Sequence, residues 1–124
     1  MKTSKDYLSE ANSTVPRISA DDAIAAHSNS TSVFVDVRDS SAIASGGTIA
    51  GAQRIPRGML EFMSDDASPF YNKAMKKEAN IYIVCAAGGQ AALAGKTLQD
   101  MGYQSVTNIG GFGEWKDAGG PIEN

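Results

Sequence analysis

The sequence predicts an α/β fold, a small doubly wound parallel sheet with helices on both faces. Two runs of apolar and β-branched residues, at 32–37 and 81–85, are typical of strands that are buried on both faces. Segments with helical spacing alternate with these runs, which is the pattern of β-α-β crossovers. A chain of 124 residues is long enough for one hydrophobic core and too short for two, so we expect a single domain.

Composition and charge narrow the classes of function. Apolar residues at 42% and charged residues at 20% are ordinary values for a soluble globular protein. A formal net charge of −3 provides no basic surface for phosphate binding, so we expect no nucleic-acid partner. The N-terminal segment lacks the apolar core of a secretory signal, and no run of about 18 apolar residues occurs. We therefore expect no membrane partner and a cytoplasmic protein.

The first third of the chain predicts an arm, a helix and a strand. Residues 1–14 are polar and aperiodic, and we expect them to form a polar arm or a short helix before the domain at 15–124. A brief strand is expected next. Ser19, with Asp22 three residues later, then forms a start to a helix that resembles a capping box. The first buried strand follows this helix.

A segment with several glycines separates the two buried strands. It contains a short strand at 53–56 (QRIP) and then a helical turn at 58–63 (GMLEFM). Pro69 lies where a helix can begin, and Tyr71 and Met75 are four residues apart on one face. We therefore predict a helix in this segment.

The second buried strand leads through a glycine-rich turn into a helix. Apolar residues recur at helical spacing after the turn, and Gly102 lies where a C-terminal cap belongs. A further strand at 105–109 (SVTNI) and a glycine turn with a short helix at 110–119 complete the domain. Ligands of such sheets bind at the carboxyl ends of the strands, where we expect Cys85, the Asp36–Arg38 pair and the turn after Pro56.

Cys85 is the only cysteine in the chain. One cysteine and one histidine cannot make an internal disulfide or a zinc site, so we expect neither a metal nor a cofactor. The side chains after Cys85 are small, so backbone N–H groups can turn inward, and the next helix adds unpaired donors. Such a nest suits a thiolate, a persulfide or an oxyanion. The loop residues are Cys85, Ala86, Ala87, Gly88, Gly89 and Gln90. The alternative is an inert cysteine that fills the end of a buried strand.

Phosphate chemistry is disfavoured at this loop. A transferring phosphoryl group normally needs a fixed guanidinium, and no arginine follows Cys85 in the sequence. The first cation is Lys96, which lies about 9 Å beyond Gln90 along a helix axis.

Five motifs in a fixed order resemble the single-domain rhodaneses, a sulfurtransferase family. They span nearly the whole chain and read ISADDA, DVRD, GTIAGAQRIP, CAAGGQAALAGKTLQDMGY and GGFGEW. The resemblance implies that Cys85 opens a six-residue active loop, accepts sulfane sulfur as a persulfide and passes it to a thiophilic acceptor. The implied donor is thiosulfate, mercaptopyruvate or a low-molecular-weight persulfide, and the acceptor is a thiol or cyanide. Nothing in the sequence identifies an acceptor protein.

Two departures from the family pattern affect this expectation. Active members often carry arginine directly after the cysteine and at the end of the loop, where this chain has Ala86 and Gln90. Thr48 stands where a histidine is usual. Because backbone amides hold the persulfide, we expect it to form, but we expect weak use of thiosulfate. The alternative is a catalytically weak or inactive binding or regulatory module on the same fold.

Several other residues are candidates for the same edge of the sheet. Arg57 and Arg38 either bind the donor or form surface ion pairs. Glu61 either faces the loop or is a solvated or ion-paired helix residue, and Phe62 and Trp115 either wall the pocket or pack in the core. We expect structural roles near the site for Asp36, Gly110, Gly111 and Trp115. Together with Gly113, the two glycines are predicted to allow a turn with positive φ.

Overall fold

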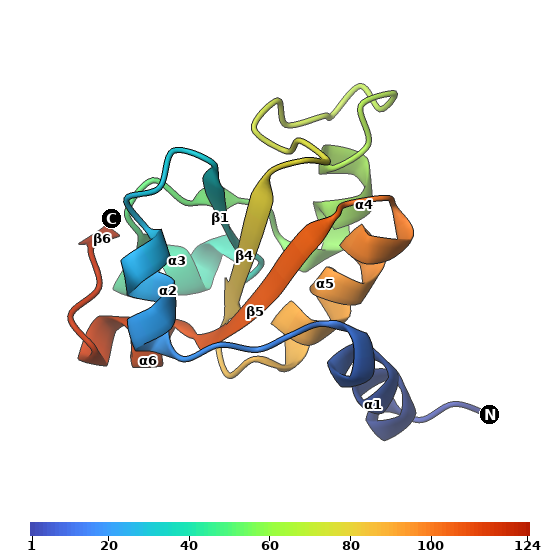
Figure 1. Ribbon diagram of the computed structural model, residues 1–124, viewed down its shortest axis with the longest axis horizontal. Helices are drawn as coiled ribbons and strands as arrows, with labels where there is room; N and C mark the ends of the chain where they lie inside the picture. The colour runs from blue at the N-terminus through green and yellow to red at the C-terminus, as the bar shows by residue number, and fades with distance from the viewer.

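The structure is a computed structural model that describes residues 1–124. Its centre is a parallel sheet with the strand order β3-β1-β4-β5 (Figure 1). The four strands are β1 (Ser32–Asp36), β3 (Gln53–Arg54), β4 (Asn80–Cys85) and β5 (Ser105–Gly111). A separate antiparallel pair joins β2 (Thr48–Ile49) to β6 (Ile122–Glu123) near the C-terminus.

Helices cover both faces of the sheet, so the predicted doubly wound α/β architecture is confirmed (Figure 1). One face carries α1 (Ser4–Thr14), the 3-10 helix η1 (Arg57–Met59), α4 (Leu60–Met63) and α5 (Gly89–Asp100). The other face carries α2 (Ala20–Ala26) and α6 (Phe112–Asp117), and α3 (Ser40–Gly46) follows β1. None of these helices is long and apolar enough to cross a membrane.

Alternate residues of the strands supply two hydrophobic clusters, one on each face of the sheet. Ile81, Ile83 and Cys85 of β4 belong to the cluster beneath α5, whereas Val84 belongs to the cluster beneath α2 and α6. This alternation is what a strand with two buried faces requires, and it explains the nearly continuous apolar run in the sequence. Cys85 therefore ends its strand on the α5 side.

Local signals correctly predicted several element boundaries. The Ser19 hydroxyl accepts a hydrogen bond from the Asp22 amide at 3.2 Å and begins α2. Gly102, with φ of +97°, follows the end of α5. The brief strand expected before α2 is a single parallel bridge between Arg17 and Asn108, which lies on β5.

The predicted helix after Pro69 is wrong, because residues 65–79 form turns. Side chains in this segment accept hydrogen bonds from backbone amides two residues later. These bonds compete with helix formation, and their acceptors are Asp65, Ser68 and Asn72. Met75 is nonetheless buried. The spacing of Tyr71 and Met75 therefore indicated the buried side of a loop and not a helix.

The sequence prediction also omitted α3 and the β2–β6 pair. The helix α3 is seven residues long, and its N-cap residue Asp39 makes no side-chain capping bond, so the sequence carries a weak start signal. The β2–β6 ladder contains two residue pairs, which is too short for a periodic pattern.

Candidate active site

The loop after β4 turns backbone N–H groups toward the Cys85 thiol. The amides of Gly88 and Ala91 lie 3.0 Å and 3.3 Å from Sγ and donate to it. Gly88 has φ of +106°, a left-handed conformation that favours glycine and lets the loop close around the sulfur. Cys85 is only 1% exposed. The loop therefore forms a nest of amide donors that can stabilise negative charge on sulfur.

Asn108 joins this loop to the neighbouring β5–α6 turn. Its Nδ2 donates to the Gly88 carbonyl at 2.9 Å, and its Oδ1 accepts from the Gly110 amide at 2.8 Å. Asn108 is buried, so these bonds satisfy both ends of an otherwise costly side chain. Sequence analysis missed this residue, although an asparagine inside the apolar strand SVTNI was an available signal.

The expected role of the glycine turn needs correction. Only Gly110 has a positive φ, of +83°, whereas Gly111 has φ of −92° and Gly113 lies inside α6. Gly111 is required for a different reason, because a Cβ there would collide with the carbonyl oxygen of Ala86. The turn packs directly against the first residues of the active loop.

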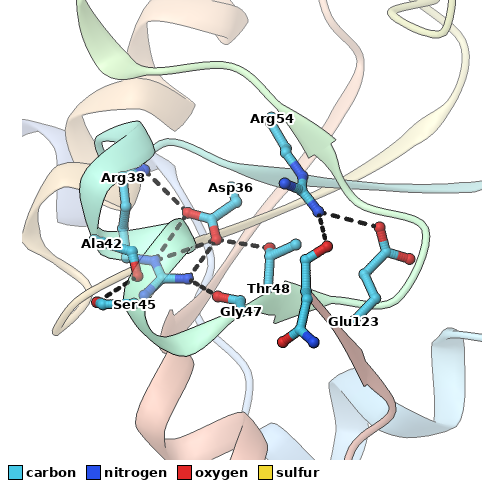
Figure 2. A network of polar contacts seen from close by, with 9 residues as sticks. Asp36, Arg38, Ala42, Ser45, Gly47, Thr48, Arg54 and Glu123 are labelled. Carbon is cyan, nitrogen blue, oxygen red and sulfur yellow. Dashed lines mark hydrogen bonds and ion pairs between the residues drawn. The ribbon is translucent and has the colours of Figure 1, made fainter.

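Asp36 and Arg38 form a buried ion pair at the carboxyl end of β1 (Figure 2). Arg38 Nη2 donates to Asp36 Oδ2 at 2.8 Å and to the Gly47 carbonyl at 2.7 Å. The Thr48 hydroxyl also donates to Asp36, at 2.7 Å. The guanidinium carbon of Arg38 lies 4.5 Å from the centre of the Phe112 ring. Arg38 is therefore occupied by structural contacts, and Asp36 fixes the segment that enters β2.

Arg57 and Glu61 pair with each other along the α5 face. Arg57 Nη1 lies 3.0 Å from Glu61 Oε1, and its Nη2 donates to the Thr97 hydroxyl at 3.1 Å. Thr97 is eight residues beyond Gly89, about 12 Å along the axis of α5 from the active loop. Arg57 lines a cavity of about 570 Å³ between α1 and α5. No hydrogen bond of Arg57 or Glu61 reaches the loop.

The two aromatic candidates lie in different environments. Phe62 in α4 is 54% exposed. Trp115 is buried beneath α6, where its ring packs near His27 and Phe34 and its Nε1 donates to the Pro121 carbonyl at 2.9 Å. Trp115 therefore anchors the C-terminal segment to the core on the side of the sheet opposite α5.

Arg17 is the cation that sequence analysis missed. Its guanidinium lies against the active loop, since a Cβ added to Gly88 would lie 2.9 Å from Cζ. A Cβ added to Gly110 would lie 3.0 Å from Nη2. Arg17 Nη2 also approaches Glu114 Oε1 at 3.5 Å. No spacing rule connects Arg17 to a loop that begins 68 residues later; the bridge to β5 brings them together.

Comparisons with solved structures identify proteins with a similar fold. A structure from Rhodopseudomonas palustris, described as a protein of unknown function and possible tyrosine phosphatase, is 44% identical with a TM-score of 0.92, covering 99% of this chain and 96% of that chain. The polysulfide-sulfur transferase homodimer of Wolinella succinogenes is 27% identical with a TM-score of 0.76, covering 96% and 85% respectively. A rhodanese-like domain from Anabaena is 29% identical with a TM-score of 0.70, covering 88% and 79%.

Among curated proteins, no sequence matches this chain. The profile of the rhodanese-like domain matches residues 19–118, which is most of the sequence and includes β1 through α6. The chain therefore belongs to the rhodanese-like domain family.

Proposed function

We propose that this protein is a sulfurtransferase that carries sulfane sulfur as a persulfide on Cys85. The observation that supports this function best is the pair of amide hydrogen bonds to Sγ. Sulfur transfer requires a thiolate nucleophile and a set of donors that can stabilise the added, negatively charged sulfur. Family membership and the similarity to a polysulfide-sulfur transferase give further support.

The proposed reaction has two displacement steps. The Cys85 thiolate attacks the outer sulfur of the donor, so that an Sγ–S bond forms and the donor loses that sulfur. The leaving group takes the electron pair, and it is sulfite when the donor is thiosulfate. A thiolate or cyanide acceptor then attacks the terminal sulfur, and the electron pair of the Sγ–S bond returns to Sγ. Charge balances in each step, and the free thiolate is regenerated.

Mass spectrometry of the intact protein tests this function directly. The reduced protein is incubated separately with thiosulfate, 3-mercaptopyruvate and glutathione persulfide. We expect one added sulfur atom, which cyanide or a thiol then removes. Cys85→Ser is the matched control, and it should remain folded and gain no sulfur, because a hydroxyl lacks the reactivity of a thiolate. If no donor modifies the folded, reduced protein, the inactive binding module becomes the better description.

A phosphatase is the second candidate, because the Rhodopseudomonas structure is described as a possible tyrosine phosphatase. The active loop argues against it, since the loop ends at Gln90 and contains no arginine of its own, and the guanidinium of Arg17 comes from outside the loop. We expect no hydrolysis of para-nitrophenyl phosphate under conditions that load sulfur onto Cys85. Hydrolysis that disappears in Cys85→Ser would reverse this preference.

A further inference from the structure

We propose that Arg17 selects anionic sulfur donors in this protein, by binding the oxyanion group of a thiosulfonate such as thiosulfate. Arg17 lies outside the active loop and would supply the guanidinium that the loop lacks. This inference rests on the proposed sulfur transfer at Cys85.

The backbone places Arg17 beside the loop. The Ile18 amide donates to the Asn108 carbonyl at 3.1 Å, and the Asn108 amide donates to the Pro16 carbonyl at 2.9 Å. These two bonds fix the extended segment around Arg17 along β5. Asn108 also binds the Gly88 carbonyl, so one buried side chain aligns the segment that carries Arg17 with the active loop.

The guanidinium of Arg17 rests on the residue whose amide binds the thiol. Its Cζ would lie 2.9 Å from a Cβ on Gly88, and the Gly88 amide donates to Cys85 Sγ. Any larger residue at position 88 would displace this guanidinium. The cationic group therefore borders the loop whose amides bind the sulfur.

Arg17 is free to bind a ligand in a way that Arg38 and Arg57 are not. Arg38 is nearly buried and makes four side-chain hydrogen bonds, and Arg57 bonds both Glu61 and Thr97. The Arg17 side chain makes one long hydrogen bond, at 3.5 Å to Glu114, and is 49% exposed. An exposed pair with this geometry contributes little free energy, so an incoming anion can replace the Glu114 carboxylate.

The chemistry of the donor explains why a cation is useful here. Thiosulfate and the Cys85 thiolate are both anions and repel each other at bonding distance. A guanidinium offers parallel N–H donors to two oxygens of the sulfonate group and offsets this repulsion. When the S–S bond breaks, sulfite leaves with the electron pair and gains negative charge, which the same group stabilises.

Single-turnover loading tests this role. The rate of persulfide formation on Cys85 is followed by quenched mass spectrometry over a range of thiosulfate concentrations. We expect Arg17→Ala to raise the half-saturating concentration about tenfold, with a partial effect for Arg17→Lys. Discharge of the preformed persulfide to 2-mercaptoethanol, which carries no oxyanion group, should stay within about twofold of wild type, because that step involves no sulfonate. Unchanged half-saturation in Arg17→Ala would overturn the inference.

Two further variants separate this role from a structural one. Glu114→Gln keeps a side-chain oxygen that can accept from the Gly111 amide, but it removes the competing carboxylate. We expect it to lower the half-saturating concentration by roughly twofold to fivefold. Arg54→Ala is the matched control, since Arg54 also lies 3.5 Å from a glutamate, Glu123, and is similarly exposed. Arg54 is on β3, with β1 between it and β4, so its loss should leave loading unchanged.

A binding measurement distinguishes failure of this inference from failure of the proposed function. In the Cys85→Ser background, thiosulfate is titrated against the backbone amide resonances of the active loop. We expect the Kd to rise about tenfold when Arg17→Ala is added. Equal binding in the two proteins, or no binding in either, overturns the role of Arg17. Binding that depends on Arg17, with no persulfide in the wild type, contradicts sulfur transfer but leaves the anion site in place.

Discussion

Thr48 donates a hydrogen bond to a fully buried carboxylate, and this contact defines what residue 48 does in this chain. Asp36 accepts from the backbone and side chain of Arg38 and from the Thr48 hydroxyl (Figure 2). The motif that the sequence resembles has histidine at this position, and in this chain the threonine hydroxyl donates to the carboxylate at 2.7 Å. With threonine at this position, Asp36 therefore still accepts a hydrogen bond from the side chain of residue 48, in addition to those from Arg38.

Substituting Thr48 tests this contact. We expect Thr48→Val to lower the free energy of unfolding by about 1.5 to 3 kcal/mol, because a buried carboxylate loses a hydrogen bond. Thr48→Ser keeps the hydroxyl and should lose less than half as much. Urea unfolding measures both values. A Thr48→Val protein as stable as Thr48→Ser would show that the hydroxyl contributes nothing.

Gln90 is the second residue whose identity departs from the family pattern. It is exposed at the start of α5, where a guanidinium could reach an anion in the loop. We expect Gln90→Arg to raise kcat/KM for thiosulfate about tenfold, since a hydrogen bond to a charged group is worth roughly 1.5 to 3 kcal/mol. Gln90→Met, which is similar in length and uncharged, should produce no gain. An unchanged kcat/KM in Gln90→Arg would count against the absence of a loop arginine as a cause of the weak thiosulfate use that the sequence predicts.

At the scale of elements, the sequence predicted what depends on neighbours in the chain. Buried strands, the Ser19 cap and the end of α5 at Gly102 follow from local patterns, and the structure confirms them. The segment at 65–79 was misassigned because it has both apolar residues at helical spacing and turn-forming side chains. Periodicity detects the helical spacing but not the turn-forming side chains. The β2–β6 pair was missed because its two strands are 73 residues apart when counted from Ile49 to Ile122.

The contact of α1 with α5 depends on a glycine inside a helix. Gly95 is buried in α5, and a Cβ there would lie 2.8 Å from Val15 Cγ1 and 3.3 Å from Val106 Cγ1. Val15 ends α1 and is itself buried. The glycine therefore lets the end of α1 approach α5 closely, at a cost to the intrinsic stability of α5.

Reversing the sizes of these two residues tests the contact. Alanine at position 95 should gain about 1 kcal/mol of helix propensity but lose about 1 to 3 kcal/mol to overpacking. We expect Gly95→Ala to destabilise the wild-type protein and to stabilise the Val15→Ala protein, where space has been created. Chemical unfolding of the four proteins in this double-mutant cycle measures the coupling. The same effect of Gly95→Ala in both backgrounds would contradict a direct contact.

At the scale of the whole molecule, the active site is partly local and partly assembled by the fold. The loop at 85–90 is continuous, so small residues after a strand were enough to predict inward-facing amides. Asn108 lies on β5, which its pairing with β4 places beside the loop, and Arg17 lies in the segment before α2, which the parallel bridge to Asn108 holds there. No local sequence pattern predicts that these two residues lie beside the loop. A sequence pattern therefore identifies Cys85 as a candidate before it identifies the residues that surround it.

Tyr103 connects the long loop at 65–79 to the start of β5, and we expect it to make the fold sensitive to alkaline pH. Its hydroxyl donates to the carbonyls of Ser64 and Met75, at 2.7 Å and 3.3 Å. Burial, together with the nearby Tyr71, raises the pKa of Tyr103 from 10.0 to about 12. The neutral phenol is thus favoured in the folded state. Its contribution to stability is complete below the unfolded pKa and is lost as the pH rises from about 10 to about 12.

Urea unfolding of wild type and Tyr103→Phe from pH 8 to pH 12 tests this linkage on the whole fold. At pH 8 we expect Tyr103→Phe to be less stable by about 1 to 3 kcal/mol, because the Ser64 carbonyl loses its donor, whereas the Met75 carbonyl keeps the Tyr71 hydroxyl. The difference should shrink above about pH 10. There the Tyr103 phenol ionises in the unfolded wild type but stays neutral in the folded protein, which lowers the free energy of unfolding, and Tyr103→Phe has no phenol at this position to ionise. Tyr7→Phe, on the exposed side of α1, controls for the loss of any tyrosine and should show no such convergence. A difference between wild type and Tyr103→Phe that stays constant up to pH 12 would mean that the Tyr103 phenol is not what links this fold to alkaline pH.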